Sequence, residues 1–285
     1  MIIVTGGAGF IGSNLVKKLN QHNFNHIIVV DKFENAAKNE NLKDTKVLNS
    51  IDRDSFFPWA SQNAESIEFI FHLGARTDTT EYNLELLRQL NTEYSKQVWN
   101  LCIKEQIPII YASSAATYGD GELGFNDDHQ LIPQLKPLNA YAQSKQEFDL
   151  WVLKNPQKPL FWAGLKFFNV YGPGEMHKGK MASMIHQAFT QIENTGRVKL
   201  FKSYKSEVAD GEQKRDFIHV DEVTDLMIKL MHYRKESGIF NVGTGQSRSF
   251  NEMVKQVFDS MSKPVNIEYI EMPNELRSKY QYHTQ

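Results

Sequence analysis

Residues 1–12 read MIIVTGGAGFIG, an apolar run that leads into glycines at positions 6, 7, 9 and 12. The run is typical of a buried strand, and helical spacing follows as far as Gln21. The glycines fit both G-x-x-G-x-x-G and G-x-G-x-x-G, a turn that lets a pyrophosphate approach the N-terminus of the next helix. A second apolar run at 26–31 ends at Asp31, nineteen residues past Gly12. This order predicts dinucleotide binding. The expected contacts from the turn are Gly6, Gly9, Phe10, Ile11 and Gly12.

The residues around Asp31 bear on which dinucleotide is bound. An acid at the end of the second strand usually accepts a hydrogen bond from the adenosine ribose, which favours NAD. Lys32, Lys38 and Arg53 could instead surround a 2′-phosphate, or they could be solvated surface charges. We expect a tightly bound NADP, one per subunit, with NAD left open.

Apolar runs alternate with helical segments over the first 170 residues. Alternation of this kind predicts an α/β fold, a Rossmann-like doubly wound parallel sheet with helices on both faces. The expected strands cover 2–5, 26–31, 69–75, 108–114 and 161–170, and the expected helices cover 13–21, 84–105 and 141–154. Later residues are less regular, with helices expected near 181–194 and 220–235 and a strand at 199–201. We expect a cofactor domain at 1–168, to which about 216–240 returns, and a smaller α/β substrate lobe at 169–215 and 241–285.

Composition points to a small-molecule partner. The 285 residues are 41% hydrophobic and 23% charged, with a net charge of -2. Lys and Arg are scattered, which argues against nucleic acid or an anionic membrane surface as partner. Cys102 has no second cysteine to pair with, and no signal peptide or membrane span is recognisable. These features predict a cytoplasmic protein, and no metal site is expected.

Tyr141 and Lys145 lie four residues apart, which places them on one face of a helix. A phenol with a pKa near ~10 is a poor base at neutral pH, and a neighbouring ammonium would lower that value. Ser114, at the end of an expected strand, would share a hydrogen bond with the same substrate oxygen. Lys145 would also hold the nicotinamide ribose. The three residues predict proton transfer coupled to hydride transfer.

Several segments in order resemble the extended short-chain dehydrogenase/reductase superfamily, whose members modify nucleotide-activated sugars. They are TGGAGFIGS, HLGA, YASSAATYG, YAQSK, FNVYGP, RDFIHV and NVGTG. Within it, ASSAATYG, the run FNVYGP-x-E-x-HKG-x-MAS and the ending RSKYQYHTQ resemble the ADP-L-glycero-D-manno-heptose 6-epimerase family. The resemblance implies inversion at C6 of a heptose carried on ADP, for the lipopolysaccharide inner core. It also implies a homo-oligomer, commonly a pentamer.

The resemblance implies two acid/base groups, Tyr141 and Lys178. An epimerase removes a hydride from one face of the carbon and returns it to the other face. The oxygens of the two epimers then point in different directions, and one acid/base group cannot easily reach both. The pKa of a lysine falls readily when it is partly desolvated or close to another cation such as Lys145. The alternative role for Lys178 is a diphosphate clamp.

Further contacts are carried over from the same resemblance. Those expected at the cofactor are Leu73, Gly74, Ala75, Asn91, Val170 and Lys178. Those expected at the substrate are Ser114, Asn169, Lys180, Gln187, Phe201, Arg215 and Tyr280. Three positions depart from the family, which usually has Arg at 174, Ser at 180 and His at 187, where this chain has Gly, Lys and Gln. The loop 202–214 is longer than usual, and we expect a last C-terminal segment to be missing.

Three other functions are weighed against this one. A dehydratase usually carries an Asp-Glu pair after the catalytic Ser or Thr, and Ala115 and Ala116 occupy that place. A UDP-sugar 4-epimerase would use the same Ser, Tyr and Lys, and only the HKG segment argues against it. A catalytically inactive nucleotide-sugar-binding protein would be expected to have lost the Tyr or the Lys.

Overall fold

A seven-stranded parallel sheet forms the centre of the larger lobe in the computed structural model, which describes residues 1–79, 81–277 and 280–285. The strand order is β10-β6-β5-β4-β1-β2-β3, and every pairing is parallel. The apolar runs form these strands because parallel strands are buried on both faces. The strands are β1 (Ile2–Thr5), β2 (Ile27–Asp31), β3 (Asn49–Asp52), β4 (Phe69–His72), β5 (Ile109–Ser114), β6 (Trp162–Phe167) and β10 (Gly238–Val242). The predicted doubly wound sheet is confirmed.

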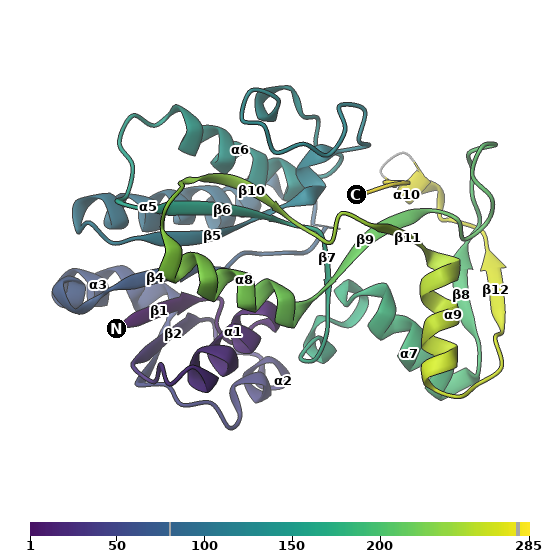
Figure 1. Cartoon of the computed structure of the whole chain (residues 1–285), viewed down its shortest axis with the longest axis horizontal. Coiled ribbons are helices and arrows are strands. Elements are labelled where there is room, and N and C mark those ends of the chain that lie inside the picture. Colours follow the sequence, from purple (N-terminus) through teal and green to yellow (C-terminus); the bar gives the residue numbers. More distant parts are fainter. Residues whose placement is uncertain (80, 278–279) are drawn as a thin grey trace.

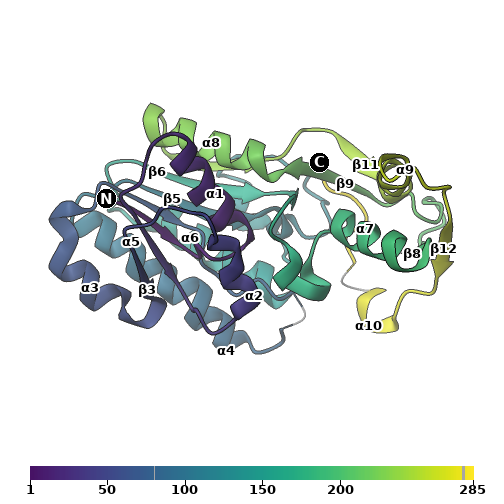
Figure 2. The same ribbon diagram turned by 90° about the horizontal axis from the view of Figure 1, so that it is seen from below.

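Helices cover both faces of this sheet (Figure 1; Figure 2). They are α1 (Phe10–Gln21), α2 (Ala36–Asn39), α3 (Phe56–Asn63), α4 (Leu84–Leu87), α5 (Tyr94–Lys104), α6 (Ala140–Lys154) and α8 (Val220–Tyr233). One hydrophobic cluster contains Leu15 of α1 and Met227 of α8. The other contains Trp99 of α5 and Phe148 of α6. The core is therefore divided into two layers by the sheet.

The helix predicted over 84–105 contains a wider turn. Residues Arg88–Glu93 form a π-helical segment between α4 and α5. This segment buries Asn91 and Thr92 against α6, where Asn91 Nδ2 donates to Ser144 Oγ at 2.9 Å and Thr92 Oγ1 donates to the Ser144 carbonyl at 3.0 Å. A wider turn of this kind often marks a functional region.

The strand predicted over 161–170 is two strands in different sheets. After β6 ends, the Val170 N–H donates to the Phe168 carbonyl at 2.9 Å, a tight turn that redirects the chain into β7 (Asn169–Tyr171). The prediction of a single strand is wrong because an apolar run does not show where the chain changes sheet.

The smaller lobe lies beyond one end of the large sheet (Figure 1). It contains a sheet of β7, β9 (Lys214–His219) and β11 (Ser247–Ser249), and the pair β8 (Val198–Phe201) and β12 (Ile267–Ile270). Its helices are α7 (Met184–Thr195), α9 (Phe250–Ser260) and α10 (Asn274–Arg277). A third hydrophobic cluster packs α7 and α9 against β8. No helix among the described residues is long and apolar enough to cross a bilayer.

Candidate active site

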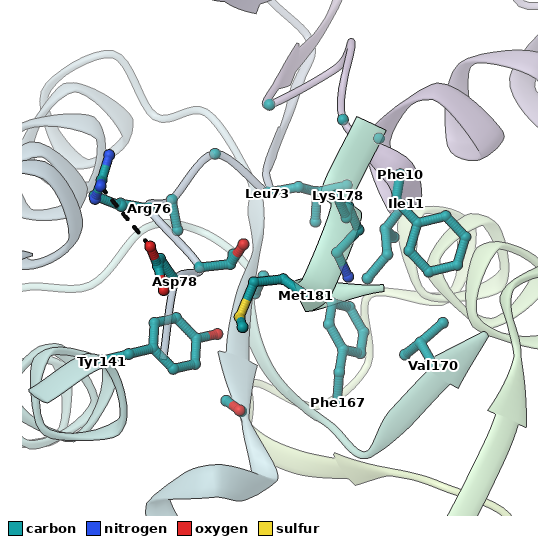
Figure 3. A pocket seen from close by; sticks show the side chains of 18 of the residues that line it. Phe10, Ile11, Leu73, Arg76, Asp78, Tyr141, Phe167, Val170, Lys178 and Met181 are labelled. Atoms are coloured by element: carbon teal, nitrogen blue, oxygen red, sulfur yellow. Dashed lines mark ion pairs between the residues drawn. The ribbon is translucent and has the colours of Figure 1, made fainter. Parts of the chain in front are cut away.

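A cavity of about 1090 Å³ opens at the carboxyl ends of the central strands, where α/β sheets usually bind ligands. All but four of the predicted site residues line it. Figure 3 shows Tyr141 and Lys178 projecting into it from different sides, with Met181 drawn between them. The four that do not line it are Asn91, Phe201, Arg215 and Tyr280.

The glycine turn has the close backbone packing that a dinucleotide site requires. Gly6 has φ +68°, and a Cβ there would lie 2.7 Å from the Gly74 Cα. A Cβ on Gly12 would lie 2.2 Å from the Gly6 carbonyl oxygen. Helix α1 begins at Phe10, so its N-terminal N–H groups face the cavity beside this turn. The turn therefore fits a nicotinamide dinucleotide, with the pyrophosphate at the start of α1.

The cations predicted near the adenosine are paired with carboxylates. Asp31 is 8% exposed, accepts from the Ala8 N–H at 3.0 Å, and forms an ion pair with Lys38. Lys32 Nζ lies 3.1 Å from Asp52 and 2.7 Å from Asp54. Arg53 also pairs with Asp54, at 3.1 Å. All three cations line the cavity, and a 2′-phosphate would compete with these carboxylates for them.

Ser114 and Tyr141 meet at the opposite end of the cavity. Ser114 ends β5, and its hydroxyl lies beside the Tyr141 phenol. Burial raises the pKa of Tyr141 above its ordinary value of 10.0, and the Ser114 hydroxyl only partly opposes this. Lys145 Nζ donates to the Ala112 carbonyl at 2.9 Å. The predicted lowering of the Tyr141 pKa by Lys145 is therefore wrong in this arrangement, because desolvation outweighs the favourable contacts.

A buried ion pair supports this end of the cavity, and our sequence reasoning missed it. Lys166 Nζ and Asp149 Oδ2 lie 2.7 Å apart, and both side chains are fully buried. Asp149 also accepts from Tyr111 at 3.1 Å and from Ser113 at 2.6 Å, while Lys166 donates to Thr117 at 2.7 Å. Burial lowers the pKa of Lys145 to about 8, and Asp149 opposes that shift. The signal in the sequence was a lysine inside the apolar run FWAGLKFF.

Asn91 lies behind the residues that line the cavity and is hydrogen-bonded to one of them. Its Oδ1 accepts from the Arg76 N–H at 2.8 Å, and its Nδ2 donates to the Arg76 carbonyl at 3.0 Å. Asn91 thus holds the segment after β4 that carries Gly74 and Ala75 into the cavity. Asn91 itself does not line the cavity, and its predicted contact with the cofactor stays a prediction.

His72 is a second buried support that the sequence reasoning missed. One ring nitrogen lies 2.7 Å from Thr5 Oγ1 and the other lies 2.8 Å from Ser95 Oγ. Thr5 Oγ1 accepts in turn from the Gly74 N–H at 3.1 Å. Burial lowers the pKa of His72 to about 3, so the ring is neutral at physiological pH. The HLGA segment contains His72, but it does not indicate that Thr5 and Ser95 are its partners.

Lys178 enters the cavity beside the start of α1. Its Nζ lies 5.3 Å from the centroid of the Phe10 ring. Burial lowers the pKa of Lys178, and Glu175 partly opposes this. The predicted direction is confirmed, with desolvation as the cause. Lys180 and Gln187 line the cavity nearby, where Gln187 Nε2 donates to the Lys180 carbonyl at 3.2 Å.

Three predicted substrate contacts form a cluster behind the cavity. The Arg215 guanidinium lies 5.5 Å from the ring centroids of both Phe250 and Tyr280, and Phe201 lies 6.4 Å from Tyr280. Arg215 donates to the Lys214 carbonyl at 2.8 Å and is 8% exposed. Phe250 lines the cavity in front of this cluster and Arg215 does not, so the predicted diphosphate contact of Arg215 stays a prediction.

Comparison with known proteins agrees with this geometry. The NAD dependent epimerase/dehydratase family matches residues 2–243. An ADP-L-glycero-D-manno-heptose-6-epimerase of Fusobacterium nucleatum is 45% identical over 295 residues, which cover 100% of this chain and 89% of that protein. The chain belongs to the NAD dependent epimerase/dehydratase family, and within it to the ADP-heptose 6-epimerases.

Other heptose epimerases extend the match. A Nitratidesulfovibrio vulgaris protein of the same name is 44% identical, over 100% of this chain and 88% of that protein. The crystal structure of the Helicobacter pylori ADP-L-glycero-D-manno-heptose-6-epimerase has a TM-score of 0.79 and 31% identity, covering 99% and 91% of the two chains. A UDP-N-acetylglucosamine 4-epimerase of Methanobrevibacter ruminantium has a TM-score of 0.82 at 23% identity, covering 99% and 87%, which shows a shared fold alone.

Proposed function

We propose that this enzyme converts ADP-D-glycero-D-manno-heptose to ADP-L-glycero-D-manno-heptose by oxidising C6 and reducing it again from the opposite face. The observation that carries the proposal is one cavity with two acid/base groups. Tyr141 lies at one side and Lys178 at another (Figure 3), and Ser114 and Lys145 line the same cavity. The 42–45% identity to curated heptose epimerases supports the substrate.

The two acid/base groups suit opposite proton transfers. The pKa of Tyr141 is raised, so the phenol stays protonated and can donate to a carbonyl oxygen. The pKa of Lys178 is lowered, so a larger fraction of the amine is neutral and can accept a hydroxyl proton. In the reverse direction the two residues exchange these roles. A bound nicotinamide dinucleotide supplies hydride transfer in both halves of the reaction.

We propose NADP as the cofactor, held by the glycine turn. Lys32, Lys38 and Arg53 line the adenosine end of the cavity and would bind the 2′-phosphate after exchanging a carboxylate partner for it. If NAD is bound instead, Asp31 accepts from the ribose and Lys38→Ala leaves affinity unchanged. Titration of NADP and NAD against wild type and Lys38→Ala distinguishes the two, because only NADP binding should weaken in the variant.

Three finer proposals rest on family resemblance. They are a homo-oligomer, commonly a pentamer in the family, a cytoplasmic location, and supply of heptose to the lipopolysaccharide inner core. Sedimentation of the purified chain tests the first, and a monomer at micromolar concentration would contradict it.

The reaction is tested with ADP-, UDP- and GDP-sugars, followed by NMR. We expect inversion of the ADP-heptose without net release of reduced cofactor. Tyr141→Phe should lose about 10²-fold or more of turnover while the cofactor stays bound. Conversion of a UDP-hexose but no ADP-heptose would replace the proposal with the 4-epimerase alternative.

A further inference from the structure

The segment that carries Lys178 closes around one buried carboxylate. Glu175 is only 1% exposed although it lies in the segment that connects β7 to α7. Its Oε1 accepts from the Gly172 N–H at 3.1 Å and from Ser183 Oγ at 2.8 Å. Its Oε2 accepts from the Ser183 N–H at 2.6 Å. Glu175 therefore joins both ends of residues 172–183, which we call the lysine loop.

The contacts of Glu175 require a carboxylate. Every partner is a donor, and an ionised carboxylate offers two acceptor oxygens and no proton. A glutamine in the same place would turn its NH₂ group toward either the Gly172 N–H or the Ser183 N–H. Two donors would then face each other, so at least one hydrogen bond of the closure would be lost.

The lysine loop is also fixed to the cofactor turn from outside. Asn14 of α1 donates to the Pro173 carbonyl at 2.8 Å. Asn41 donates to the Gly174 carbonyl at 3.1 Å and to the Ala8 carbonyl at 3.2 Å, so one side chain joins the loop and the glycine turn. The loop and the turn therefore hold a fixed relative position.

Lys178 has little freedom at its own backbone. Its N–H donates to the Glu175 carbonyl at 2.9 Å, which forms the turn that faces the lysine toward the cavity. At the far end of the side chain, the ammonium lies over the Phe10 ring. Glu175 thus contacts the turn through its backbone and closes the loop through its side chain.

We propose that Glu175 is a positioning residue for the proton transfer by Lys178, holding this lysine at the reacting end of the cavity through the closed lysine loop. The inference rests on the proposed function, in which Lys178 transfers a proton. Glu175 itself does not touch the substrate. Its carboxylate acts only through the geometry of the loop and the position of Lys178.

A double-mutant cycle tests this inference. Glu175→Gln should lower kcat by about 10- to 100-fold, because a displacement near 1 Å can cost that much, and should change KM for the ADP-heptose by no more than about threefold. Lys178→Met should lower kcat at least as far. The double variant should match Lys178→Met within about twofold, because Glu175 has nothing left to position. Ser183→Ala, which removes one of the three hydrogen bonds, should show a smaller loss.

Hydrogen exchange supplies a readout that does not depend on activity. The Gly172 and Ser183 amides should exchange faster in Glu175→Gln, whereas the exposed Glu193→Gln on α7 serves as the matched control and should behave as wild type. A wild-type kcat in Glu175→Gln, or a double variant far slower than Lys178→Met, would overturn the inference alone. A wild-type kcat in Lys178→Met would instead remove the two-base function, and the role of Glu175 with it.

Discussion

Replacing Lys166 by methionine isolates the buried ion pair beneath the catalytic end of the cavity. Lys166 and Asp149 are both 0% exposed and lie 2.7 Å apart. Methionine fills a similar volume but leaves the Asp149 carboxylate without its cation. Tyr111 and Ser113 would still donate to it, so two of its hydrogen bonds remain and the loss is mainly electrostatic.

The size of the effect follows from burial. Breaking a buried pair by removing one partner costs about 3–5 kcal/mol, because an uncompensated charge stays in the interior. For a chain of this size each kcal/mol shifts Tm by about 2–4 °C, so Lys166→Met should melt roughly 6–20 °C below wild type. Asp149→Asn, which leaves Lys166 unpaired, should lose a similar amount.

The decisive variant combines both changes. Asp149→Asn with Lys166→Met removes both ions, and the asparagine amide can still pair with the two hydroxyl groups. We expect it to lie within about 2 kcal/mol of wild type and to be more stable than either single variant. Thermal unfolding at a fixed cofactor concentration measures this. If the double variant lost as much unfolding free energy as the two single variants together, the broken ion pair would not be the cause of their losses.

Three further predictions follow from the cavity. Burial lowers the pKa of Lys145 to about 8, so its ammonium is lost as the pH rises through 8. Cofactor affinity should therefore fall above that pH, and an affinity that stays constant from about pH 7 to about 9.5 would contradict this. Gly12→Ala should weaken cofactor binding by about 10²-fold or more in calorimetry, since the added Cβ would lie 2.2 Å from the Gly6 carbonyl oxygen. His72, with a pKa lowered to about 3, should show no NMR titration between pH 5 and 8, and a midpoint near 6 would place its ring in water.

The sequence predicts the strands whose apolar runs are continuous and misses strands with a more mixed pattern, β3 and β10 among them. Runs such as IIVT and FIFH are continuous and apolar, so β1 and β4 could be recognised. Strand β3 reads NSID at the sheet edge, where two of its four residues are exposed, and no pattern marks it. Helix α9 could have been predicted, because Ser249 and Glu252 have the spacing of a capping box and form one.

The residues of the candidate site were predictable where a local motif carries the chemistry. The glycine turn and the spacing of Tyr141 and Lys145 are short-range patterns, and the cavity brings them together. Partners that lie far apart in the chain could not be predicted in this way. Asp149 meets Lys166 only because α6 packs beside β5 and β6. Burial in the same region raises the pKa of Tyr141, which the sequence interpretation expected to be lowered.

Gly174 shows why the family pattern alone does not fix the geometry of the lysine loop. The family usually has arginine there, whereas this backbone has φ +95°, a region that favours glycine. A Cβ at this position would lie 3.4 Å from Asn41 Oδ1 and 3.5 Å from Asn14 Nδ2, the two side chains that fix the loop to the cofactor turn. Both distances are ordinary contacts, so the strain that a larger residue would meet here comes from the positive φ of the backbone. In this chain the position of Lys178 depends on contacts that span more than a hundred residues, and a motif of twelve residues cannot encode them.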